Sequence, residues 1–173
     1  MIEPNHFAIP PWRAGPDWSQ AVHSLKHLSA GNWAKLMQAR KLADRIEKKL
    51  YSIDDGLATL CNATCSTCID ICCEKATVWY DFKDLLYLCL RFNRLPASQI
   101  YKKTDLTCRH LGSTGCNLPR PLRPFICTWY LCPNQAALCS GQGPEGWHRL
   151  QGAIQEIQGL RRQLESEFIQ AVR

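Results

Sequence analysis

The stretch from residue 61 to residue 73 reads Cys61-Asn-Ala-Thr-Cys65-Ser-Thr-Cys68-Ile-Asp-Ile-Cys72-Cys73. In its CxxC pair, Cys65 and Cys68, two sulfurs can converge on one metal ion while the intervening backbone amides donate hydrogen bonds to the thiolates. Cys72 and Cys73 are adjacent, so on an extended backbone their side chains point apart. Which of these two is a ligand therefore stays open. Because the stretch has no helical period, we expect a loop here, followed by an extended piece at residues 76–80.

A second group of cysteines lies further along the chain, at Cys108, Cys116, Cys127, Cys132 and Cys139. Glycines at 112 and 115 can adopt positive φ and wrap the chain between two ligands, and prolines at 119, 121 and 124 stiffen the approach to Cys127. Neither group completes a tetrahedral site comfortably alone. The two groups together predict a site that is closed across the fold.

The chain holds eleven cysteines in 173 residues, about 6%, which is below the level of secreted disulfide scaffolds. Its first residues lack the basic and apolar regions of a secretory signal, and its longest apolar run, residues 85–90, is too short to span a bilayer. We therefore expect a cytoplasmic protein without membrane contact. In that reducing compartment a cysteine cluster indicates metal ligands first and redox or catalytic groups second.

Several of these motifs resemble one known family. They are Cys65-x2-Cys68-x3-Cys72-Cys73, Cys108-x2-Leu111, Gly115-Cys116-x-Leu118 and Arg123-Pro124-x2-Cys127. In order and spacing they resemble the YkgJ-type cysteine-cluster family, a zinc- or iron-chelating domain with the motif CxxCxxCC. The resemblance covers about residues 61–132. Residues 69–71 make the first motif one residue longer and lack its usual glycine, as in divergent relatives found in flagellin lysine methylases, which implies an iron–sulfur cluster as well as zinc.

By position, the resemblance implies a ligand set of Cys65, Cys68, Cys72, Cys73, Cys108, Cys116 and Cys127. Cys132 joins this set as an eighth ligand because it follows Cys127 closely. The cofactor implied is Zn²⁺ or iron, the latter including an iron–sulfur cluster. Thiolate ligation argues against magnesium and calcium, which prefer oxygen.

Three further residues near these motifs have expected roles of their own. Arg123 is expected to brace backbone carbonyls or to balance thiolate charge near Cys127. His110 can be a ligand or an outer partner of the metal site. Cys89 lies in an apolar segment and is expected to be a small core residue.

Apolar spacing predicts a mainly α protein, a single domain over residues 1–173 with the cysteine core at 61–132. Helices are expected at about 17–30, with Asp17 as cap, at 33–53, at 82–92 directly after Asp81, and from Pro144 to near the C-terminus. The first long helix (33–53) and the last are amphipathic and flank a loop-rich cysteine centre that the metal stabilises. Residues 1–18 are expected to form an irregular arm, residues 104–143 a loop, and Pro96 the end of the third helix.

The formal charge of +6 arises from basic residues that occur as scattered pairs, such as Lys48-Lys49 and Arg161-Arg162. Such pairs are typical of solvated helix faces, so nucleic acid is not an expected partner. The expected partners are a metal ion and, second, another protein. Cys61-x3-Cys65-x2-Cys68 also matches the radical S-adenosylmethionine motif, but the chain lacks the alternating strands and helices of that barrel and the aromatic residue that usually precedes the last cysteine, where Thr67 stands.

Three functions remain open on this basis. The first is a cysteine-rich metal-binding module. The second is an iron–sulfur-dependent enzyme, or an accessory protein, for a modification such as methyl transfer. The third is a thiol-redox or metal-handling protein. Because no acid–base pair can be named, the sequence favours metal binding over catalysis.

Overall fold

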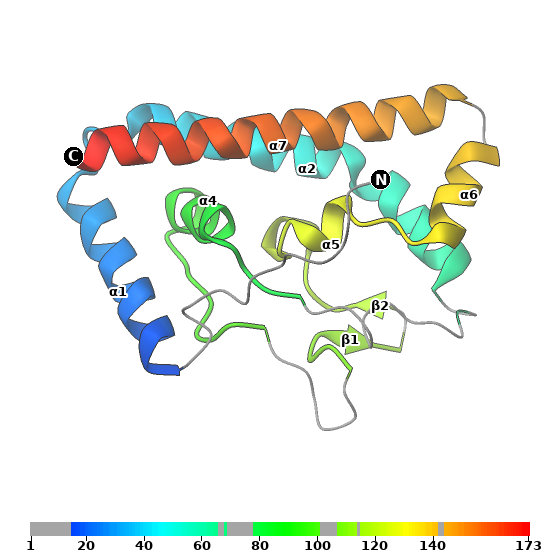
Figure 1. The fold of residues 1–173 in the computed structure, drawn as a ribbon, viewed down its shortest axis with the longest axis horizontal. Coiled ribbons are helices and arrows are strands. Elements are labelled where there is room, and N and C mark those ends of the chain that lie inside the picture. The colour runs from blue at the N-terminus through cyan, green and yellow to red at the C-terminus, as the bar shows by residue number, and fades with distance from the viewer. Residues whose placement is uncertain (1–14, 66–67, 69–77, 101–106, 114, 142–143) are drawn as a thin grey trace.

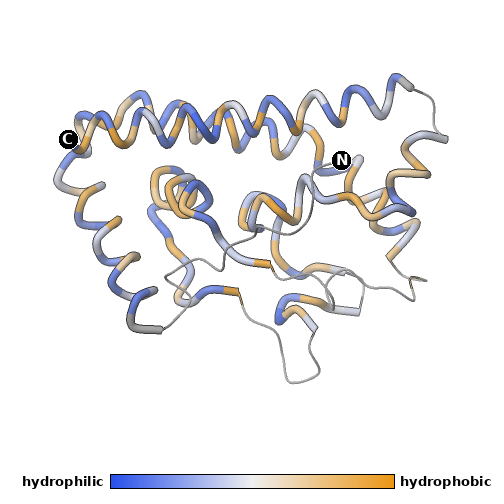
Figure 2. The backbone as a smooth tube through the Cα atoms, viewed as in Figure 1, coloured by the Kyte–Doolittle hydropathy of each residue, from blue (hydrophilic) through white to orange (hydrophobic). Residues whose placement is uncertain are grey.

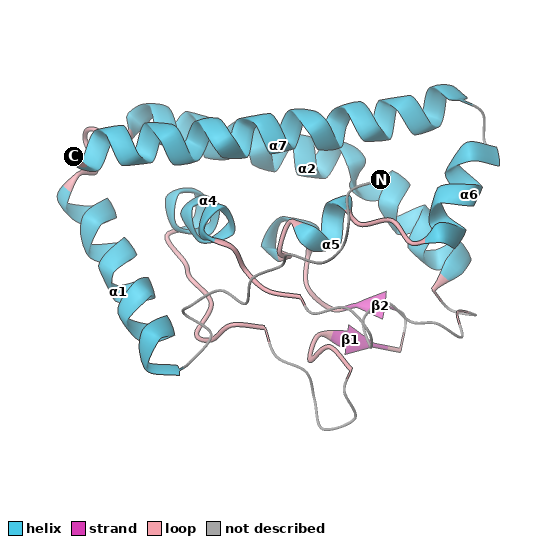
Figure 3. Cartoon of the chain, in the orientation of Figure 1, coloured by secondary structure: helices cyan, strands magenta, loops and turns pink. Residues whose placement is uncertain are grey.

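The computed structural model describes residues 15–65, 68, 78–100, 107–113, 115–141 and 144–173, and this part of the chain is mainly helical, as predicted (Figures 1 and 3). The elements are α1 (Gly15–Gly31), α2 (Met37–Thr64), α4 (Phe82–Phe92), β1 (Leu111–Gly112), β2 (Gly115–Cys116), η2 (Arg120–Leu122), α5 (Ile126–Trp129), α6 (Pro133–Gly141) and α7 (Pro144–Val172). None of the helices within these ranges is long and apolar enough to cross a membrane.

The two long helices, α2 and α7, lie side by side and form the upper layer of the molecule in Figure 1. Along both helices hydrophobic and hydrophilic positions alternate with the helical period (Figure 2). The hydrophobic positions meet in the core, where Ile46 of α2 and Ile157 and Leu164 of α7 are almost completely buried. The predicted pair of amphipathic helices is therefore confirmed, and it covers the cysteine-bearing segments from one side.

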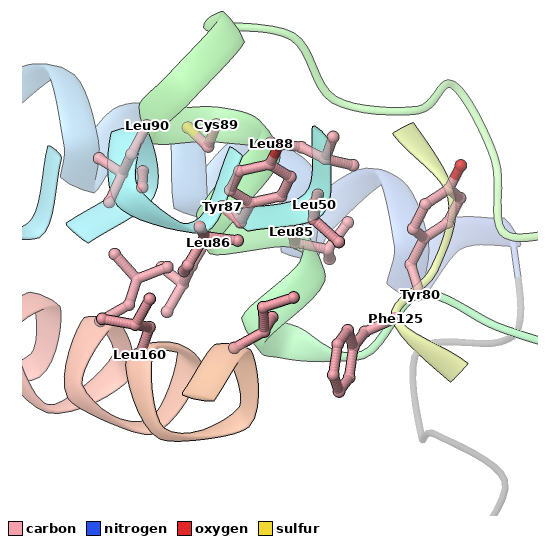
Figure 4. Close-up of a cluster of buried hydrophobic side chains, with 14 of the residues drawn as sticks. Leu50, Tyr80, Leu85, Leu86, Tyr87, Leu88, Cys89, Leu90, Phe125 and Leu160 are labelled. Carbon is pink, nitrogen blue, oxygen red and sulfur yellow. The ribbon is translucent and has the colours of Figure 1, made fainter. Parts of the chain in front are cut away.

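Helix α4 is the buried centre of the fold, and residues 84–90 are all buried. Its first turn is closed by a capping box: the Asp81 side chain accepts a hydrogen bond from the Asp84 N–H, and the Asp84 side chain accepts one from the Asp81 N–H. Figure 4 shows Leu86 of α4 and Leu160 of α7 within one cluster of buried side chains. The range 82–92 and the burial were predicted. Asn93, in the left-handed conformation (φ 48°), stops the helix three residues before Pro96, to which the sequence assigned its end.

Helix α1 packs against α4 and ends at Gly31, as predicted. Its inward residues are Trp18 and Leu25, and the Trp18 indole N–H donates to the Pro96 carbonyl oxygen at 3.3 Å. The helix begins at Gly15, inside the range assigned to the N-terminal arm. The remainder of that arm lies outside the described residues.

Two predicted loops are wrong in part. Residues 61–64, assigned to a cysteine loop, form the last turn of α2, because the spacing of Ile53, Leu57 and Leu60 carries the buried stripe of the helix forward. Residues 104–143, assigned to a loop, contain η2, a short hairpin of β1 and β2, and the helices α5 and α6. No strand is assigned at 78–80, the described part of the extended piece expected at 76–80.

Candidate metal centre

Cys108 and Cys116 are placed by a tight antiparallel hairpin, in which Leu111 of β1 pairs with Cys116 of β2. The carbonyl oxygen of Cys108 accepts a hydrogen bond from the Leu111 N–H at 2.9 Å, which turns the chain into β1. Gly115 has φ of +115°, a conformation that residues with a side chain rarely adopt. The predicted wrap of the chain between two cysteines therefore depends on Gly115.

Cys127 lies on the short helix α5, and its thiol shares one environment with Cys108 and Cys116. Burial, and after it the neighbouring Cys116 and Cys108, raise the pKa of the Cys127 thiol to about 12. The pKa of Tyr80 is also raised. Burial is the largest cause, Asp84 is the second, and the same three cysteines follow. The Tyr80 hydroxyl donates to the Leu122 carbonyl oxygen at 3.0 Å. Three predicted ligands, separated in the sequence, are thus close enough to influence one another electrostatically.

Arg123 braces the segment between Cys116 and Cys127, as the sequence predicted. Its Nε donates to the Leu118 carbonyl oxygen at 2.7 Å, and its Nη2 donates to the Cys116 carbonyl oxygen at 3.3 Å. Its positive charge also lowers the pKa of Cys127, although burial has the larger and opposite effect. Arg123 therefore fixes the backbone at one cysteine and stabilises the thiolate of another.

Arg120 ties the same segment to α2. The side chain is buried, its Nε lies 2.9 Å from Asp54 Oδ1, and its Nη1 donates to the Cys127 carbonyl oxygen at 3.4 Å. A buried guanidinium needs a charged partner, which Asp54 provides, and the Cys127 carbonyl oxygen accepts from a second N–H group. The position of the Cys127 backbone is thus set from the long helix α2.

The segment between Cys116 and Cys127 is also connected to α4 and α7. Asp84 Oδ1 accepts hydrogen bonds from the Phe125 N–H at 3.1 Å and from Arg161 Nη1 at 2.6 Å. The Arg161 Nη2 group also lies 2.8 Å from Asp81 Oδ1, and its guanidinium stacks on the Phe125 ring at 4.6 Å. Burial raises the pKa of Asp84 to about 6, an effect that Arg161 opposes.

The position of Arg161 corrects the interpretation of the pair Arg161-Arg162 as part of a solvated face. Only 4% of Arg161 is exposed, whereas Arg162 is exposed. The helical period alone places Arg161 beside the core residues Leu160 and Leu164. The carboxylates that pair with it come from α4 and its cap, far away in the sequence.

Cys61 and Cys65 lie at the C-terminal end of α2, one helical turn apart, and face a glutamine of α6. The Nε2 of Gln135 lies 3.6 Å from Cys61 Sγ and 3.8 Å from Cys65 Sγ. Gln135 is 7% exposed, and its Oε1 accepts a hydrogen bond from the Cys132 N–H at 3.3 Å. Cys61 was outside the predicted ligand set, and Gln135 was not predicted.

The other predicted site residues are distributed as follows. Cys68 is half-buried, and its N–H donates to the Cys65 carbonyl oxygen at 3.4 Å. Cys132 is half-buried immediately before α6. Cys72 and Cys73 lie outside the described residues. Cys89 is a core residue, as predicted, with its Sγ 3.5 Å from Ser29 Oγ.

His110 lies between Cys108 and β1 and is half-buried. Burial and the neighbouring Arg109 lower its pKa, so the neutral imidazole is favoured. Across the described ranges, no three Cys, His, Asp or Glu side chains form a group that could hold a metal ion. Cys108, Cys116 and Cys127 are therefore neighbours without being arranged as a closed ligand shell.

Comparison with models of protein families finds no match to this chain. No curated protein matches it either. The same holds for solved structures. The resemblance to the cysteine-cluster family therefore stays a prediction from the spacing of the motifs.

Proposed function

We propose that this chain is a cysteine-ligated metal-binding protein, with zinc or iron held by a centre that includes Cys108, Cys116 and Cys127. The observation that supports the proposal most is the shared environment of these three cysteines, which come from the hairpin and from α5. Thiolates are the preferred protein ligands of zinc and of iron–sulfur clusters.

The chemistry of the three thiols fits a cation better than it fits free reactive cysteines. A thiol with the raised pKa of Cys127 stays protonated at neutral pH and is a poor nucleophile. A metal ion replaces that proton and neutralises the thiolate charges that otherwise repel one another. Arg123 provides a permanent positive charge beside the group.

A metal-handling role is a second candidate, favoured by the three braces around the segment. Arg120, Arg123 and Asp84 hold backbone groups of Cys127, Cys116 and Phe125, and none of these hydrogen bonds uses a sulfur atom. A segment held in this way can keep its shape while an ion enters or leaves. A purely structural zinc site, in contrast, folds only around its metal.

The experiment that tests the proposal is a measurement of zinc, iron and acid-labile sulfide per chain after purification without oxygen. We expect zinc without sulfide, or iron with matching sulfide, in the wild type. Cys127→Ser should lose most of this metal. Cys89→Ser is the matched control, because Cys89 is buried in the core beside Ser29. A wild type without metal, or equal loss in the two variants, would overturn the proposal.

A loss of metal does not by itself separate the two candidates, so folding is measured on the same samples. If the ion is handled rather than structural, metal-free wild type should keep its helical circular dichroism and a cooperative unfolding transition. Loss of that transition on chelation would favour the structural role.

A further inference from the structure

The structure assigns a second thiolate site, at which Cys61 and Cys65 bind a soft, thiophilic metal ion and Gln135 donates one N–H to each sulfur. This inference rests on the proposed function, because it extends cysteine–metal binding to a pair of residues outside the Cys108, Cys116 and Cys127 group. It adds Cys61 to the ligands and names a residue of α6 that supports them.

The geometry begins with the end of α2. Cys61 and Cys65 are four positions apart, so their side chains lie on the same face of this last turn. Helices α2 and α6 pack against each other, and α6 lies next to this end of α2 in Figure 1. Gln135 is therefore presented directly to both sulfurs, at 3.6 and 3.8 Å from its Nε2.

The orientation of the Gln135 amide follows from its other contact. Its Oε1 lies 3.3 Å from the backbone nitrogen of Cys132, which can only donate. The NH₂ group must therefore point to the sulfurs, and its two hydrogens match two acceptors. A neutral thiol is a weak acceptor, whereas a thiolate accepts N–H hydrogen bonds well. The buried amide is thus arranged for two thiolates.

A cation is favoured beside two sulfurs at this position. The C-terminal end of a helix carries the negative end of its dipole, which attracts a bound cation to the last turn of α2. The Cys65 Sγ also lies 3.8 Å from Thr64 Oγ1, whose hydrogen is donated to the Leu60 carbonyl oxygen at 2.7 Å. A soft metal ion can take the place of the two thiol protons.

The pair lies on a different element from the first group. Cys61 and Cys65 are at the end of α2, whereas Cys108 and Cys116 belong to the hairpin region and Cys127 lies on α5. The sequence predicted Cys65 as a ligand together with the other motif cysteines. The distances from Gln135 Nε2 add Cys61 beside it.

The test is a titration of the full chain with Cd²⁺, after metal removal under reducing conditions, followed by thiolate-to-metal charge-transfer absorption. We expect Cys61→Ser to bind one Cd²⁺ fewer than the wild type and to keep the ion that depends on Cys127. Cys127→Ser should show the reverse, and the double variant should lose both. Cys139→Ser is the control, since Cys139 is buried on the same helix as Gln135.

A second variant tests the role of Gln135 as a positioning residue. Gln135→Leu should retain the number of bound ions but weaken the site that depends on Cys61 by roughly tenfold to a hundredfold. Gln155→Leu, an exposed glutamine of α7, is the matched control and should bind as the wild type does.

The outcomes separate the two proposals. If Cys61→Ser binds as many ions as the wild type while Cys127→Ser loses one, the second site is wrong and the proposed function stands. If Cys61→Ser loses an ion and Cys127→Ser loses none, the second site stands and the first centre is wrong. A wild type that binds no Cd²⁺ overturns both.

Discussion

Thr128 places a hydroxyl group next to Cys127 where it has no hydrogen-bond partner among the described residues, although the residue is only 1% exposed. An unpaired buried hydroxyl costs about 1–3 kcal/mol, and valine has nearly the same shape. We therefore expect Thr128→Val to raise the free energy of unfolding by about 1 kcal/mol, measured by chemical denaturation, and to leave bound metal unchanged.

Tyr87→Phe is the comparison for that variant, because the Tyr87 hydroxyl of α4 is also buried and unpaired within the described chain. It should give a similar gain on α4, outside the segment that carries Cys127. A gain for Tyr87→Phe together with a loss of stability or metal for Thr128→Val would mean that the Thr128 hydroxyl has a role at the centre.

Cys89 differs chemically from the cysteines of the candidate centres. Burial raises its pKa, and it is 3% exposed in the core. The thiolate is the reactive form, so Cys89 should resist alkylation by iodoacetamide at neutral pH in the folded protein. Mass spectrometry before and after denaturation checks this expectation. Labelling of native Cys89 as fast as in the unfolded chain would contradict its assignment to the core.

Among the elements, α6 depends on one polar contact at its start. Pro133 is its first residue, and Gln135 accepts a hydrogen bond from the preceding Cys132 N–H. Gln135→Leu removes this acceptor and should lower stability by about 1 kcal/mol. Gln135→Glu keeps a side-chain oxygen as acceptor and should retain most of the wild-type stability. Hydrogen exchange of the α6 amides measures the difference, and equal protection in the two variants would show that the contact does not hold α6.

Elements were predictable where their signals are local. The cap at Asp81, the apolar run of α4 and the periodic stripe of α7 can all be recognised within one helix. Residues 54–64 of α2 were missed, although Leu57 and Leu60 continue the apolar spacing, because the cysteines that follow indicated a loop. The start of α6 carried a signal too, Pro133 followed by Gln135, but it is short and lies among cysteines.

The site was less predictable than the helices, because its supporting contacts join distant parts of the chain. Arg123 acts within seven residues of its partners, and its bracing role followed from the sequence. Arg161 and Asp84 are 77 residues apart, and nothing in either segment indicates the other. The same applies to Gln135 and Cys61, which meet only because α6 packs on the end of α2.

At the scale of the whole molecule, Asp84 and Arg161 connect α4, α7 and the segment before Cys127. Both side chains are nearly inaccessible, with exposed fractions of 6% and 4%. Arg161→Met leaves Asp84 buried without its main charged partner, which typically costs 3–5 kcal/mol. We expect a loss of about 3 kcal/mol in chemical denaturation. Arg162→Met, an exposed neighbour, should change stability by less than about 0.5 kcal/mol.

The same carboxyl group makes stability depend on pH. Burial raises the pKa of Asp84 to about 6 in the folded chain, against about 3.9 when unfolded. The folded state therefore holds the proton more tightly, so its contribution to stability is full below about pH 4 and is lost as the pH rises through 6.

Asp84→Asn removes this titration and also breaks the capping box, because an amide N–H would face the Asp81 N–H. The variant should be less stable than the wild type, and the gap should shrink by about 2 kcal/mol between pH 4 and pH 7. Urea denaturation of both proteins across this range measures the gap, and other titrating groups cancel in the difference. A gap that widens with pH would mean that Arg161 outweighs burial and holds Asp84 ionised, and the brace beside Cys127 would then be a permanent ion pair.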